Sequence, residues 1–418
     1  MLASVQASRS QALTSCILVL AFFVIQREAM SAGTVIAWGN NQFGQTTIPT
    51  GLSNVVAVSA SGDFNLALRS DGIVTAWGGF NTPTNIPVGA SNVTAVASGF
   101  AYGLVLRADG TVFGWGQNDV GQATGTPSAG YAAAPVTIGG QTLQGAIAIS
   151  GRGSFSVALQ ANGAVKAWGA NDFGQVSVPV GLQGVTAVSA GEWHGLALKA
   201  DRTVVAWGAG STTNHNQSGQ SGQSLVPPGL VNVVRVAAGS IHSLALTGDG
   251  TVVGWGRNDL GQATGTPTTT PPFVASGQVL IGGSPLTGVA SIAAGGYSSV
   301  AILTNGTVVA WGWNAYGLNS PPPGLSGAVA GSVGSTHGLV LLGDNVNGIP
   351  TQMGIFNAVE VTWNAQLGSR YQIQWASALN TNLWFNYGSE IVGNGTTNSF
   401  FDTIRGRPSR FYRVIVLP

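Results

Sequence analysis

The chain has 418 residues with a formal net charge of +1 at pH 7, and only 7% of its residues are charged. So few basic groups cannot neutralise many phosphates, which argues against nucleic acid as a partner. Glycine contributes 63 residues, and the hydrophobic share of 44% is too high for a disordered chain. The composition therefore indicates a folded, turn-rich β protein.

Residues 1–31 are predicted to be a signal peptide. Residues 16–25, CILVLAFFVI, form an apolar run that is short for a bilayer span and typical of a signal-peptide core. Ala29 and Ser31 supply the small residues that a signal peptidase reads, so cleavage is expected after Ser31. An uncleaved anchor is the alternative. After cleavage we expect no membrane span and a protein that is secreted or held at the cell surface or in the periplasm. The only cysteine is Cys16, so no disulfide or thiolate metal site is expected in the mature chain.

Between residues 32 and 347 a Trp-Gly pair recurs after short apolar strands. A second phrase follows each pair, for example VTAVSAGEWHGLAL at 185–198, and Asp-Gly or Asn-Gly turns connect the phrases. Apolar strands joined by Asp-Gly are a strong hairpin signal, and their repetition at this spacing predicts propeller blades or solenoid coils. The recurring tryptophans are Trp38, Trp77, Trp115, Trp168, Trp207, Trp255 and Trp311.

The phrases AWGxNxxGQ, VxAVSAGxxHxLAL and DGTVxAWG resemble the regulator of chromosome condensation repeat family, whose members form seven-bladed β-propellers. The resemblance covers about residues 33–344. The chain enters with half a hairpin, GTVIAWG at 33–39, and leaves the repeats with the other half, HGLVLLGD at 337–344. We therefore expect an all-β, seven-bladed propeller closed by pairing of its N-terminal and C-terminal strands, which removes two exposed sheet edges.

The repeat pattern stops before residue 348. Alternating segments such as VEVTWNAQLGSRYQIQWASAL then predict several short strands. Residues 348–418 are interpreted as a small β-sandwich, similar to the fibronectin-type or immunoglobulin-like modules of secreted bacterial proteins. The expected organisation is a signal peptide (1–31), a propeller (32–347) and this module (348–418), as a monomer.

The tryptophans and three histidines are predicted to be structural. The tryptophans are expected to pack between neighbouring blades. His194, His242 and His337 share one repeat position, where we align Asn65, Tyr102, Phe155 and Ser298 in the other units. A catalytic or metal-binding triad is the alternative, but the family carries a structural histidine there and Phe155 can fill the position. No catalytic or cofactor-binding motif is present in the sequence. The chain is therefore predicted to be non-enzymatic, with no cofactor and no metal.

Large apolar residues occupy the turn just before this histidine position. Together with two neighbouring aromatics they define a candidate partner-binding rim, because exposed aromatic groups form protein hot spots and sugar platforms. Burial between blades is the alternative for these side chains. The candidate rim residues are Phe64, Phe100, Tyr102, Trp193, Ile241 and Tyr297.

The function predicted from these features is an exported, non-enzymatic propeller scaffold that binds a protein partner through its loop face. A carbohydrate-binding cell-surface module is the alternative, followed by a propeller hydrolase or lyase. The resemblance also implies guanine nucleotide exchange and chromatin docking, but a signal peptide and a near-neutral propeller disfavour both. A secreted bacterial β-lactamase inhibitor protein built on this propeller resembles the chain more closely in setting, and it suggests rim binding as the mode.

Overall fold

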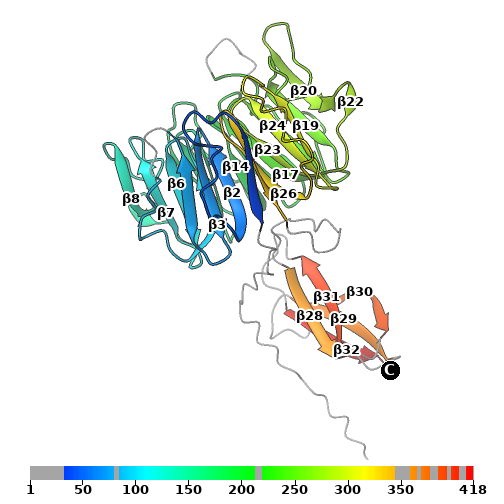
Figure 1. Ribbon diagram of the computed structural model, residues 1–418. Helices are drawn as coiled ribbons and strands as arrows, with labels where there is room; N and C mark the ends of the chain where they lie inside the picture. The colour runs from blue at the N-terminus through cyan, green and yellow to red at the C-terminus, as the bar shows by residue number, and fades with distance from the viewer. Residues whose placement is uncertain are drawn as a thin grey trace, which may run out of the picture.

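The computed structural model describes residues 33–79, 84–211, 219–343, 358–364, 369–376, 385–392, 397–403 and 411–417. Within these ranges the regular structure consists of strands, and there is no helix (Figure 1). The prediction of an all-β chain is confirmed. The predicted signal peptide lies outside the described residues.

The repeats form antiparallel sheets of three or four strands. In chain order, the sheets consist of β2 (Val55–Ser61), β3 (Phe64–Arg69) and β4 (Val74–Gly78); β5 (Val93–Ser98), β6 (Tyr102–Arg107), β7 (Val112–Gln117) and β8 (Tyr131–Pro135); β11 (Ala146–Arg152), β12 (Phe155–Gln160) and β13 (Val165–Gly169); β14 (Val185–Ala190), β15 (His194–Lys199) and β16 (Val204–Gly208); β17 (Val233–Ala238), β18 (His242–Thr247), β19 (Val252–Arg257) and β20 (Val274–Gln278); β23 (Val289–Ala294), β24 (Ser298–Leu303) and β25 (Val308–Gly312); and β26 (Ala328–Val333), β27 (His337–Leu342) and β1 (Thr34–Gly39). Two short hairpins, β9 (Thr137–Ile138) with β10 (Gln141–Thr142) and β21 (Leu280–Ile281) with β22 (Ser284–Pro285), follow the two four-stranded sheets.

The first strand of the chain completes the last sheet of the repeats. Strand β1 pairs with β27 along its whole length, from Thr34 opposite Leu342 to Gly39 opposite His337. In Figure 1 the dark-blue first strand lies beside the yellow end of the repeat region. Residues from the two ends of the repeat region therefore share one sheet.

Neighbouring sheets contact one another through their first strands, in the order β2, β5, β11, β14, β17, β23, β26 and back to β2. Backbone hydrogen bonds join the adjacent turns as well. The amide of Ser240 donates to the carbonyl of Gly295 at 3.0 Å, and the amide of Ser335 donates to the carbonyl of Gly62 at 2.8 Å. The second of these bonds links the last sheet to the first.

The core lies between neighbouring sheets, because the middle strand of each sheet is covered on both faces. In β15, as in every other middle strand of the repeats, all residues but the last are buried. This burial accounts for continuous runs such as LAL, where a half-exposed strand would alternate. One hydrophobic cluster joins Leu196 and Leu198 of one sheet to Val233 and Trp255 of the next.

The Trp-Gly and Gly-Gln parts of the repeat contact each other across neighbouring units. All seven recurring tryptophans are buried. The indole N–H of Trp207 donates to the carbonyl of Gln175 at 2.8 Å, and that of Trp255 donates to the carbonyl of Gln223 at 2.8 Å. Gly208, which follows Trp207, has a φ of +93°, and a Cβ there would lie 2.7 Å from the Trp193 carbonyl. Only glycine meets both constraints.

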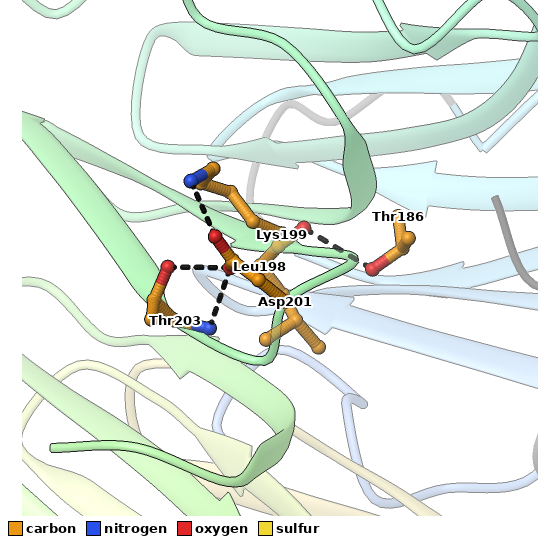
Figure 2. Close-up of polar contacts among 5 residues, drawn as sticks. All are labelled: Thr186, Leu198, Lys199, Asp201 and Thr203. Carbon is orange, nitrogen blue, oxygen red and sulfur yellow. Dashed lines mark hydrogen bonds and ion pairs between the residues drawn. The ribbon is translucent and has the colours of Figure 1, made fainter.

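Asp201 stabilises the hairpin between β15 and β16 through its own neighbours (Figure 2). Its carboxylate accepts bonds from Lys199 Nζ at 2.7 Å and from the backbone amide and hydroxyl of Thr203 at 3.1 and 2.6 Å. The Lys199 bond, with those from Thr203, lowers the pKa of Asp201 to about 2. Asp201 therefore acts as a turn residue.

The strands after the repeats form sheets of their own. Strand β28 (Ala358–Asn364) pairs with β31 (Thr397–Thr403), and β29 (Arg370–Ala376) lies between β30 (Phe385–Val392) and β32 (Phe411–Leu417). All of these pairings are antiparallel. These strands are drawn in orange and red in Figure 1.

Candidate functional site

The three repeat-position histidines are buried and bonded to the next sheet. His194 Nε2 lies 2.9 Å from Ser243 Oγ, and His242 Nε2 lies 2.9 Å from Ser299 Oγ. The Ser243 hydroxyl hydrogen is already donated to the carbonyl of Gln223, at 2.8 Å. His194 must therefore donate from Nε2, and the same argument applies to His242, because Ser299 donates to Gln262.

The third histidine makes the equivalent bond with an amide in place of a hydroxyl. His337 Nε2 lies 2.6 Å from Asn65 Oδ1, and Asn65 Nδ2 donates to the carbonyl of Gln45. This bond joins the last sheet of the repeats to the first. In the second sheet Tyr102 takes the role of the histidine, with its hydroxyl 2.8 Å from Ser156 Oγ. We call this set of bonds the inter-sheet relay.

Burial keeps the three histidines neutral. It lowers the pKa of each from 6.5 to about 3, with a further contribution from the positive charge of Arg152. Each Nδ1 atom is buried and has no hydrogen-bond partner in the described structure. Such groups serve packing and hydrogen bonding, and they cannot exchange protons with a substrate in solution. Within the described residues no group of three or more His, Cys, Asp or Glu side chains is placed to hold a metal ion.

The strand register corrects the alignment of the first repeat. Phe64 pairs with Gly78, as His194 pairs with Gly208 and Phe155 with Gly169. Phe64 therefore occupies the histidine position, which the sequence comparison gave to Asn65. Counting from the first strand gives the same position, because Phe64 follows Val55 by as many residues as His194 follows Val185.

The turns between first and middle strands lie at the same end of the sheets as the loops that follow the outer strands. The Cβ position of Gly208 shows this, because it lies within 3.3 Å of Trp193 in one turn and Gln175 in one loop. Gly312 is placed in the same way between Tyr297 and Gln262. We call this end the loop face.

Three of the predicted rim residues cannot form a binding rim, because their side chains are buried. Phe64 and Tyr102 are fully buried in the histidine position, between sheets, and Ile241 is 4% exposed. The other three reach solvent: Phe100 is 59% exposed, Tyr297 is 39% exposed and Trp193 is half-buried. The burial alternative thus applies to half of the predicted set.

Aromatic residues that the rim prediction omitted lie against two of the remaining three, Trp193 and Tyr297. The rings of Phe173 and Trp193 are 5.6 Å apart between centroids, and we call them the Phe173–Trp193 pair. Tyr297, Trp313 and Tyr316 form a second cluster, with centroids 6.4 and 5.5 Å apart and edge-to-face geometry. The Phe173–Trp193 pair joins a turn of one sheet to the loop that follows the preceding sheet, whereas Tyr297 contacts the loop that follows the outer strand of its own sheet.

A repeat pattern could have revealed two of the three omitted residues. Phe173 and Tyr316 occupy the position just before glycine in the NxxGQ-like loop phrase. With one exception, the other described units also have apolar residues at this position. These residues are Phe43, Val120 and Leu260. Val120, Leu260 and Tyr316 are exposed. The loop phrase therefore contributes a second set of apolar side chains to the loop face.

Arg152 is a further residue that sequence reasoning missed. It is buried, and its Nη2 donates to the carbonyls of Ala294 and Val333 at 2.8 and 2.7 Å, which belong to two other sheets. Burial lowers its pKa to about 10, against the opposing effect of Glu192, so it remains charged at neutral pH. The signal was a charged residue three positions before Phe155, where five other units have glycine and one has Ser61.

Comparison with known proteins agrees with this geometry. Residues 93–122, 185–220, 233–262 and 289–318 match the family model for the Regulator of chromosome condensation (RCC1) repeat. No curated protein matches the chain significantly. Among the described residues no helix has the length and apolarity needed to cross a membrane. The matched segments and the sheets together define an RCC1-like propeller fold.

Solved structures show the same fold at low sequence identity. Prp20p from Saccharomyces cerevisiae, characterised for its binding to Gsp1p and histones, is 19% identical with a TM-score of 0.56, covering 76% of this chain and 93% of that one. Yeast RCC1 (Prp20) bound to Kap60 gives 18% identity and a TM-score of 0.59, covering 77% of this chain and 90% of that one. Human WBSCR16 gives 18% identity and a TM-score of 0.55, covering 75% of this chain and all of that one (100%). At such identities the likeness concerns the fold alone.

Proposed function

We propose that the chain is an exported, non-enzymatic propeller of seven blades, closed by β1 and β27, that binds a protein partner through its loop face. The observation that carries the proposal is the set of solvent-reaching aromatics at that end. The Phe173–Trp193 pair and the Tyr297–Trp313–Tyr316 cluster lie on turns and loops that backbone hydrogen bonds join, from Ala209 N to the Trp193 carbonyl and from Trp313 N to the Tyr297 carbonyl. Pre-ordered aromatic groups give large contact areas at low entropic cost, which is how protein hot spots are built.

The relatives in fold support binding as the mode of action. Prp20p binds Gsp1p and histones, and yeast RCC1 is bound by Kap60. A catalytic role has less support, since the repeat-position histidines are buried and neutral. Residues 348–418 would form a separate small β-sandwich beside the propeller of 32–347.

Export is tested at the N-terminus. Because the apolar run ends at Ile25 and Ala29 and Ser31 suit a signal peptidase, we expect the secreted protein to begin near Ala32. Sequencing of the N-terminus of material recovered outside the cytoplasm checks this. Secreted material that retains Met1 would contradict the cleavage site.

The binding site is tested by comparing two tryptophans. Trp193→Ala should lower the affinity for the partner at least tenfold with little loss of folding stability, because Trp193 is half-buried on the loop face. Trp168→Ala should instead lower the free energy of unfolding by about 3–5 kcal/mol, since Trp168 is buried and its indole donates to the Gln122 carbonyl. The measurements are urea unfolding of both variants and titration with a partner recovered by affinity capture.

Trp193→Phe is the matched control, since it keeps a ring against Phe173. Equal destabilisation by Trp193→Ala and Trp168→Ala would place Trp193 in the core and remove it from the site. Glycan binding that depends on Trp193, in the absence of any protein partner, would favour the carbohydrate-binding alternative.

A further inference from the structure

The loop face carries more acidic than basic groups. Among its described residues the carboxylates are Asp63, Asp119, Asp172, Glu192 and Asp259. The basic groups are Arg152, which is buried, and Arg257, whose guanidinium is bonded to Asp259 at 2.7 Å. The Gln117 amide, which donates to Asp119, lowers the pKa of that carboxyl. At neutral pH the solvent-reaching charges of this face therefore sum to a negative value, because Arg257 offsets only Asp259.

The opposite end of the sheets has no such excess. Its hairpin turns contain Asp71, Asp109, Asp201 and Asp249, matched by Arg69, Arg107, Lys199 and Arg202. Two of these acids are in ion pairs, Asp71 with Arg69 and Asp201 with Lys199. The negative potential is thus a property of the aromatic end of the molecule.

At the Phe173–Trp193 pair, solvent-reaching aromatic rings and acidic residues occur together. Asp172 precedes Phe173 in the chain and is exposed, and Glu192 precedes Trp193 and is half-buried. Within the described structure neither carboxylate is in an ion pair, although the buried Arg152 lies near enough to Glu192 for their charges to interact. Aromatic rings attract cations through their faces, and neighbouring carboxylates strengthen that attraction. The other cluster, Tyr297–Trp313–Tyr316, has Gly296 and Asn314 beside it and no such flanking acids.

We propose that the partner presents a basic segment to the loop face, with an arginine or lysine side chain seated at the Phe173–Trp193 pair between Asp172 and Glu192. This inference rests on the proposed function, since it names the chemistry of the partner for the same face. Apolar residues of the partner segment then contact the Tyr297–Trp313–Tyr316 cluster. A protein that presents an acidic surface is repelled by this end.

The test is a selection of random dodecapeptides displayed on phage, with the full-length protein as bait, followed by titration of individual synthetic peptides. Enriched peptides should contain arginine or lysine beside apolar residues. Replacing that residue by citrulline or acetyl-lysine should weaken binding at least tenfold. The double variant Asp172→Asn/Glu192→Gln should lose at least tenfold for the unmodified peptide, and added salt should reduce the difference.

Asp109→Asn is the matched control, because Asp109 is an exposed acid at the opposite end, and it should leave affinity unchanged. Thermal unfolding of each variant establishes that the fold is intact. Peptides that need Trp193 but contain no basic residue, or that bind the double variant as well as the wild type, would overturn this inference and leave protein binding by the loop face standing. A selection that yields no Trp193-dependent peptide would count against both proposals.

Discussion

Deletion of residues 1–40 is expected to unfold the repeat region as a whole. The deletion removes β1, which pairs with β27 over its full length, and with it the buried side chains of Val35 and Trp38. Loss of one buried tryptophan alone costs about 3–5 kcal/mol, which is comparable with the whole net stability of many domains. The edge of β27 is then exposed and prone to aggregation. Circular dichroism and thermal melting measure the result.

Two other deletions provide the controls. Removal of residues 1–31 keeps β1 and should leave the melting temperature unchanged. Removal of 349–418 leaves every repeat strand in place and should also leave a cooperative transition. If the 1–40 deletion melted like the 1–31 deletion while the 349–418 deletion melted far lower, β1 would not be essential and the domain assignment would be reversed.

Acid should destabilise the protein well above the pH at which carboxyl groups titrate. The pKa of His194, His242 and His337 falls from 6.5 to about 3 on burial, so between these values the unfolded chain binds protons that the folded chain does not. Stability is therefore full above pH 6.5, falls as the pH drops toward 3, and levels off below that. For an ordinary unfolded-state pKa the loss at pH 5 is on the order of 2 kcal/mol per histidine.

His242→Tyr provides a test that keeps the packing. Tyr102 already occupies the same repeat position, with its hydroxyl bonded to Ser156 as His242 is bonded to Ser299. Urea unfolding at pH 7.5 and pH 5 should show a smaller loss of stability for the variant than for the wild type. An identical loss would mean that His242 is not the source of the pH dependence.

The strands of the repeats were predictable because the information for them is local. Asp-Gly turns such as Asp71–Gly72 are sufficient to define hairpins, and the continuous apolar runs match middle strands buried on both faces. The loop face was less predictable, because exposure there is decided by contacts between units. Trp193 and Ile241 occupy equivalent positions, yet Trp193 lies beside Phe173 and stays half-exposed while Ile241 is buried. Arg152 was missed because its carbonyl partners lie in sheets distant in the sequence.

The inter-sheet relay divides the junctions between neighbouring sheets into two kinds. Where a sheet has histidine or tyrosine at the repeat position, the next sheet provides a hydroxyl or an amide, as in His194 with Ser243. Other sheets have Phe64, Phe155 or Ser298 at the histidine position. In each case the next sheet has glycine immediately after its histidine position. Those glycines are Gly103, Gly195 and Gly338.

This pairing limits how the gene can change by recombination between its repeats. A unit moved so that His194 faced a glycine would bury a ring N–H without an acceptor, at a cost of about 1–3 kcal/mol. A serine in place of Gly195, in the sheet that follows the one with Phe155, would put a Cβ 2.3 Å from the ring of Trp207. The units therefore resemble each other in sequence but are not interchangeable in order, and we expect shuffled arrangements that mix the two kinds of junction to be less stable whatever their effect on binding.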